Sequence, residues 1–184
     1  MLLYIQKSLL LRYNRYKLKL MKVSLIALVF LIMCGGQQSG ENGPSISEQQ
    51  EMVAAVNKIR TNGCYCGRRY MKPVSKVKWS NKLYQSALNQ ANDMNKHHFF
   101  AHFSNEGLDI GDRLDVVGYN WKVAGENLGE GQLTFEEVLG DWLKSYSHCT
   151  MLMNPKVTEM AIAHVDKYWV QHFGTPMETE EQNH

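Results

Sequence analysis

The clearest candidates for chemistry in this 184-residue chain are two histidines and a glutamate, His102, Glu126 and His148. Imidazole is a frequent ligand of zinc and copper, and a carboxylate can orient an imidazole or bind the metal itself. The three residues come from separate segments, so a folded domain has to bring them together. The alternative is that they are polar residues lining a surface groove, and composition alone does not separate the two interpretations.

Most familiar catalytic motifs are absent from the sequence. It has no Gly-x-Ser-x-Gly elbow, no phosphate-binding loop and no dinucleotide fingerprint. His98 and His102 have the spacing of a zinc-peptidase helix, but Phe99 stands where the glutamate base is needed. We expect ordinary surface or sheet positions for His97, His98, His164 and His172. Core positions are expected for Phe99, Phe100, Trp121, Trp142 and Trp169.

Residues 1–34 carry six Lys or Arg and no Asp or Glu, and residues 23–33 are apolar except for Ser24. That run is shorter than the roughly 20 residues of a membrane span. A basic flank and a short apolar core are typical of a secretory signal. Cys34, at the end of the run, resembles a bacterial lipoprotein processing site, although Met33 is bulkier than that pattern prefers. Ordinary secretion is the alternative.

Met21 followed by Lys22 resembles the natural start of such a signal, so residues 1–20 are either an over-long gene start or a real basic extension. Setting residues 1–34 aside leaves 14 of the 20 Lys and Arg against all 18 Asp and Glu, a formal charge of −4. Nothing resembles a phosphate-binding stripe, so a nucleic-acid partner is not expected. We expect an exported protein, either an envelope lipoprotein or a secreted one, that meets the membrane only through its N-terminal signal or lipid anchor.

Three cysteines follow Cys34: Cys64, Cys66 and Cys149. An exported domain folds under oxidising conditions, so one disulfide is expected, and three thiols cannot all pair internally. Cys64 and Cys66 are too close together for an easy pair, so Cys149 is expected to bridge to one of them. A metal site at Cys-x-Cys would need a fourth ligand. A nucleophilic Cys149 beside His148 is disfavoured by the expected disulfide.

The sequence predicts a flexible tether at residues 35–46, one domain at 47–175 and an acidic tail at 176–184. Capping boxes predict that one helix begins at Ser45 and another at Thr134, and the second of these helices is expected to continue to Tyr146. A further helix is expected to begin after Ser80 as its cap and to end at residues 97–100. Residues 64–76 are expected to form a loop. A short helix is expected at 109–117, and strands at 121–128, 159–165 and 168–174. The fold class is α+β.

Nine short blocks in this order resemble the CAP superfamily of cysteine-rich secretory, antigen 5 and plant pathogenesis-related proteins, and most of all its bacterial SCP-like branch. Together they extend over about residues 50–174. The blocks are Val77–Leu83, Phe99–His102, Gly111–Leu114, Gly118-Tyr119, Gly125–Leu128, Trp142 with Ser147–Cys149, Asn154-Pro155, Thr158–Met160 and Tyr168–Gln171.

The resemblance implies a three-layer α-β-α sandwich with a central antiparallel sheet and a large cleft. His102, Glu126 and His148 match three of the four cleft residues, and the histidines of the family can hold a divalent metal such as zinc. Ser145 stands where many eukaryotic members have a second glutamate, so a weaker or different metal site is expected. The family pattern also favours a disulfide from the Cys64 and Cys66 segment to Cys149.

Two further departures from the bacterial pattern are Tyr146-Ser147 in place of Pro-Gly and Ala161 in place of Gly. Both are expected to alter the loop around His148. Because no catalytic nucleophile and no second carboxylate are found, we expect a non-enzymatic binding module with a divalent-metal cleft. The resemblance adds an apolar ligand as a candidate, since some relatives bind one, and a peptide is the other candidate ligand. One alternative is a metal-assisted hydrolase or peptidase, in which Glu126 is the base and His102 and His148 hold the metal. Another is a structural or host-interaction role at the cell surface.

Overall fold

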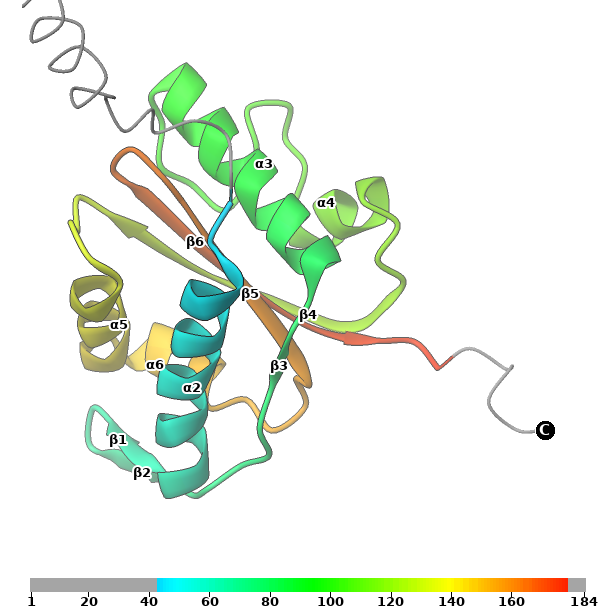
Figure 1. Cartoon of the computed structure of the whole chain (residues 1–184). Helices are drawn as coiled ribbons and strands as arrows, with labels where there is room; N and C mark the ends of the chain where they lie inside the picture. The colour runs from blue at the N-terminus through cyan, green and yellow to red at the C-terminus, as the bar shows by residue number, and fades with distance from the viewer. Residues whose placement is uncertain (1–42, 179–184) are drawn as a thin grey trace, which may run out of the picture. The chain divides into compact units, whose positions relative to one another are not determined.

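The computed structural model describes residues 43–178 (Figure 1). The predicted signal segment with Cys34, residues 35–42 of the tether and residues 179–184 of the tail lie outside the described residues. Among the residues that are described, no helix is long and apolar enough to cross a membrane.

A four-stranded sheet forms the centre of the domain, in the order β3-β5-β6-β4. Strands β5 (Glu159–Val165) and β6 (Tyr168–Pro176) lie at two of the predicted strands. They form an antiparallel hairpin joined through Asp166, whose φ of 54° makes the tight turn. Strand β4 (Trp121–Glu130) pairs antiparallel with β6, so it forms one outer edge of the sheet. The short β3 (Lys78–Trp79) pairs parallel with β5.

Helices cover both faces of this sheet, which gives the predicted three-layer α-β-α sandwich (Figure 1). Helices α3 (Asn81–His97) and α4 (Ile110–Val116) cover one side, called here the α3 face. Helices α2 (Ile46–Asn62), α5 (Phe135–Lys144) and α6 (Tyr146–Leu152) cover the other, called the α6 face. Because side chains alternate along a strand, each strand contributes to both cores.

The amphipathic helices match the sequence closely. Ser45 and Glu48 form the predicted capping box at the start of α2. Four apolar side chains at helical spacing along α3 are completely buried: Leu83, Ala87, Ala91 and Met94. Its small alanines let α3 lie close to β5 and β6.

The predicted loop at 64–76 is wrong in its first half, which forms a two-stranded hairpin of β1 (Cys64–Cys66) and β2 (Arg69–Met71). The tyrosine rings at positions 65 and 70 pack across it, with centroids 5.2 Å apart. The strands are too short to give a clear period-two pattern, and a disulfide from Cys66 to α6 anchors the hairpin.

The single helix predicted to run from Thr134 through Tyr146 is also wrong, because the chain breaks at Ser145. This residue has extended dihedral angles and separates α5 from α6. The Thr134 hydroxyl does accept from the Glu137 amide, but the Glu137 carboxylate accepts from Leu133 instead of Thr134, so only half the capping box forms.

Two smaller expectations also differ from the structure. The Ser80 side chain makes no capping hydrogen bond, although α3 does begin after it. Phe100 was expected in the core but is 46% exposed, because α3 has ended before it at His97.

Candidate functional site

The buried carboxylate of Glu126 joins three basic side chains. Its Oε1 accepts a hydrogen bond from Nδ1 of His102 at 2.7 Å. Its Oε2 accepts from Nη2 of Arg113 at 2.6 Å and from Nε2 of His172 at 2.8 Å. The Glu126 side chain is only 3% exposed, whereas that of His102 is 60% exposed. One imidazole of the predicted set is therefore held at the surface by a buried anion.

The strand register explains why Glu126 and His172 meet. They are directly paired across β4 and β6, so their side chains project from the same face of the sheet. Arg113 lies on α4, which covers that α3 face, and its Nη1 donates to the carbonyls of His102 at 2.8 Å and Leu108 at 2.9 Å. Arg113 therefore fixes both the carboxylate and the backbone that carries His102.

This arrangement sets the charge of each group. Burial raises the pKa of Glu126, but hydrogen bonds from His102 and His172 and the charge of Arg113 outweigh it and lower the pKa to about 2. The hydrogen bond to Glu126 raises the pKa of His102. Burial lowers the pKa of His172, so this imidazole is neutral and donates from Nε2. Glu126 therefore stays ionised at physiological pH.

His148 approaches from the other side of β4. It lies on α6, and its backbone carbonyl accepts from Nδ2 of Asn127 at 3.2 Å. Asn127 follows Glu126 on the strand and therefore faces the α6 side. Burial lowers the pKa of His148, and the charge of His102 lowers it further.

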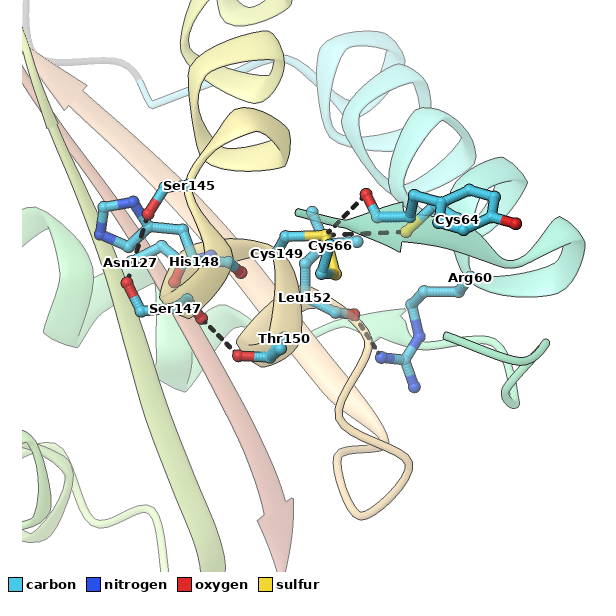
Figure 2. Close-up of a disulfide and its surroundings, with 11 residues drawn as sticks. Arg60, Cys64, Cys66, Asn127, Ser145, Ser147, His148, Cys149, Thr150 and Leu152 are labelled. Atoms are coloured by element: carbon cyan, nitrogen blue, oxygen red, sulfur yellow. Dashed lines mark hydrogen bonds between the residues drawn. A yellow bond between two sulfur atoms is a disulfide. The ribbon is translucent and has the colours of Figure 1, made fainter. Parts of the chain in front are cut away.

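Gly125 leaves room on β4 for the Met151 side chain of α6. A Cβ atom at this position would clash with the thioether end of Met151, so that flexible side chain would have to shift. Figure 2 shows His148 pointing from α6 toward β4 while Cys149 points toward the β1–β2 hairpin. The residues of the Gly125–Leu128 block thus place Glu126 on one face of β4, whereas Gly125 and Asn127 contact residues of α6 on the other.

Ser145 lies at the start of α6, near His148 (Figure 2). Its hydroxyl lies 3.2 Å from that of Ser147, and it supplies no carboxylate. The chain therefore presents two imidazoles and one buried carboxylate here.

The positions of the candidate ligand atoms limit which residues could bind one metal ion together. Among the described residues, one group of three or more His, Cys, Asp or Glu ligand atoms lies within 4.8 Å of one another, and it is Cys64, Cys66 and Cys149. His102, Glu126 and His148 do not form such a group. His102 nevertheless fits a metal, since its Nδ1 is held by a carboxylate and its Nε2 is left to coordinate, as metal-binding histidines commonly do.

A groove of about 700 Å³ lies elsewhere, between α2 and the segment 76–79. Its lining includes Val53, Asn57, Val77 and Trp79, and it does not include the histidines. The groove is therefore separate from the predicted metal ligands.

Sequence reasoning missed two members of the site. His172 was expected to be an ordinary surface or sheet residue; it does lie in a strand, but it is fully buried against Glu126. Arg113 was noted within the Gly111–Leu114 block without a role. The other histidines take no part: His97 lies 3.6 Å from Asp93 on α3, and the ring of His164 stacks on Trp169 at 3.8 Å.

Relatives of known sequence match parts of this chain. YkwD of Bacillus subtilis is 33% identical over 93 residues, which cover 50% of this chain and 36% of YkwD. The B. subtilis membrane protein YlbC is 26% identical over 100 residues, covering 54% of this chain and 29% of YlbC. The matched region thus spans about a third of the length of these two relatives.

Solved structures share the fold. An extracellular SCP-domain protein of Bacillus anthracis superposes with a TM-score of 0.60 at 22% identity, covering 73% of this chain and 45% of that one. An outer surface protein of Borrelia burgdorferi gives 0.60 at 16% identity, covering 75% of this chain and all of that one. The model of the CAP family, described as the cysteine-rich secretory protein family, matches residues 53–173. The chain therefore belongs to the CAP family of cysteine-rich secretory proteins.

Proposed function

We propose that this CAP domain is a non-enzymatic binding module that holds a divalent metal such as zinc through His102 and His148. The observation that carries the proposal is the 2.7 Å contact from His102 Nδ1 to Glu126 Oε1. A buried anion there selects the imidazole orientation and leaves Nε2 for a ligand. When bound, the metal would supply positive charge and open coordination positions to an incoming ligand.

The same contacts weigh against Glu126 as a general base in a hydrolase. Both of its oxygens accept hydrogen bonds from basic side chains, and its pKa is lowered to about 2. A base with so low a pKa is a poor proton acceptor at neutral pH. Glu126 is better suited to orient His102 than to accept a proton.

We also propose that the protein works outside the cytoplasm. Support comes from the signal-like pattern of residues 1–34 and from a disulfide within the domain. Two proteins of the same fold, the extracellular protein of B. anthracis and the outer surface protein of B. burgdorferi, agree with this location. Lipid attachment at Cys34, rather than simple release, is the finer part of the proposal.

Calorimetric titration of the full chain with Zn²⁺ at neutral pH tests the metal site. We expect measurable binding that His102→Ala and His148→Ala each weaken at least tenfold. His97→Ala is the matched control, because His97 is an accessible histidine outside the site, and it should bind as the parent does. Equal binding by all four proteins, or none by the parent, would reject the proposal. Absence of peptide or ester turnover in the zinc-loaded parent would separate binding from catalysis.

A further inference from the structure

The three cysteines of the domain lie together beneath the β1–β2 hairpin. Cys66 and Cys149 form a disulfide, and the Cys64 sulfur lies 3.7 Å from the Cys149 sulfur (Figure 2). The positions 64 and 66 are two residues apart on β1, so both side chains leave the same face of the strand, toward α6. The free thiol of Cys64 is therefore in contact with the sulfur of Cys149, which both possible disulfides share.

We propose that these cysteines form a thiol–disulfide exchange site in which Cys149 pairs alternately with Cys66 and Cys64. The inference is independent of the metal site. The fold brings both cysteines of β1 within reach of Cys149.

The exchange is balanced within the chain. The Cys64 thiol loses its proton to solvent, and its thiolate attacks Sγ of Cys149. The new Cys64–Cys149 bond forms as the Cys66–Cys149 bond breaks, and the electron pair leaves on Cys66, which then takes up a proton. One disulfide and one thiol exist before and after the step, so neither an oxidant nor a reductant is consumed.

The two states differ in what they expose. Cys64 is partly exposed, whereas Cys66 and Cys149 are completely buried. In the pairing of this structure the free thiol is open to modification from solvent, and after exchange the free thiol lies at a buried position. The hairpin would therefore present or withhold a modifiable thiol according to which partner Cys149 holds.

The rate should rise with pH. The thiolate is the attacking species, and burial raises the pKa of the Cys64 thiol above its ordinary value. Below that pKa, each pH unit changes the thiolate fraction about tenfold. Exchange should be slow in mild acid and fast in mild alkali, which allows each state to be trapped by acidification.

The test uses the full chain carrying Cys34→Ser, without reductant. Samples held at pH 6 or 8.5 are acidified, unfolded in guanidinium chloride and labelled with N-ethylmaleimide, and fragmentation of the tryptic peptide 61–68 locates the label. We expect the label on Cys64 at pH 6 and on both Cys64 and Cys66 after incubation at pH 8.5. Adding Cys64→Ser removes the attacking thiol and should abolish labelling, which controls for disulfide opening.

A second variant tests the other pairing directly. Adding Cys66→Ser should give a Cys64–Cys149 disulfide after treatment with oxidised glutathione. Label on Cys64 alone in the Cys34→Ser chain, at both pH values and all times, would overturn the proposal whichever bond the Cys66→Ser chain forms. That result also decides the question if the Cys66→Ser chain does not fold.

Discussion

The two faces of the sheet hold their functional residues by different means. On the α3 face, His102 is positioned by the hydrogen bond that it donates to the ionised Glu126, whose other oxygen accepts from Arg113 and from the neutral His172. On the α6 face, His148 lies on a seven-residue helix. The residue after it, Cys149, is joined by a disulfide to Cys66 of the β1–β2 hairpin. The α3 face depends on protonation states, whereas the α6 face depends on redox state.

This difference shows how a small domain can fix two imidazoles independently. A buried ion cluster is rigid only while each charge keeps its partner. A disulfide acts chiefly by limiting the unfolded chain, and it stabilises at any pH that leaves it intact. Perturbing one face should therefore leave the other face largely unaffected, and the predictions below test that separation.

Arg113→Ala should give the largest loss of stability. Glu126 would lose its one fully charged buried partner, and the His102 and Leu108 carbonyls would lose a donor. Breaking a buried charge pair typically costs about 3–5 kcal/mol. Urea unfolding at neutral pH measures the effect, with Arg69→Ala on the exposed hairpin as the matched control. A loss no larger than that of the control would mean that Arg113 does not stabilise the carboxylate.

Cys149→Ser should be the next most costly change, and it should act on the α6 face alone. It removes the sulfur common to both possible pairings and opens a link between positions 83 residues apart. We expect a loss of about 2–4 kcal/mol in the free energy of unfolding. Cys64→Ser, which leaves the Cys66–Cys149 bond, is the control and should cost little. Equal stabilities for the two variants would contradict the assigned disulfide.

Acid should weaken the α3 face. The folded pKa of Glu126, about 2, lies below its ordinary value of 4.5, so its contribution is complete above pH 4.5 and is lost as pH falls toward 2. The lowered pKa of His172 acts with the same sign from about pH 6.5 downward. For Glu126 alone we expect a loss of about 1 kcal/mol between pH 7 and 4.

Unfolding free energies measured at pH 7, 5.5 and 4 test this dependence. His102 acts with the opposite sign, because its pKa is raised, but its exposed side chain makes that contribution small. The Cys149→Ser chain should lose as much on acidification as the parent, since its α3 face is intact. A Glu126→Gln chain that loses as much as the parent would contradict the prediction.

Much of this fold could be predicted from local patterns. The buried stripe of α3, the capping box at Ser45 and the link at Asp166 are each encoded within a few residues. The hairpin at 64–71 was missed because its strands have three residues each and a distant cysteine holds them. Short strands anchored from outside leave little signal in their own sequence.

The site was predicted less completely for a related reason. His102, Glu126 and His148 were recognised through short motifs, but the contact of His172 with Glu126 depends on the register of β4 against β6 across 46 residues. A sequence alone does not specify that register. The side of β4 from which each imidazole approaches likewise becomes visible only when the sandwich is assembled.

Ser145→Glu should have the smallest effect on stability, and it tests whether the α6 face contributes to the metal site. Ser145 precedes α6 and makes no capping hydrogen bond, so replacing it should change the free energy of unfolding by less than about 0.5 kcal/mol. A carboxylate there would add an oxygen ligand near His148, on the face that otherwise offers an imidazole alone. If the two histidines share a metal, we expect Zn²⁺ affinity to rise about tenfold, within the range that residues around metal sites control.

Ser147→Glu, two residues along α6, is the matched control for added negative charge. Equal gains from both variants would indicate a general electrostatic effect, whereas a gain from position 145 alone would indicate that the α6 face contributes a ligand at a defined place beside the His102–Glu126 pair.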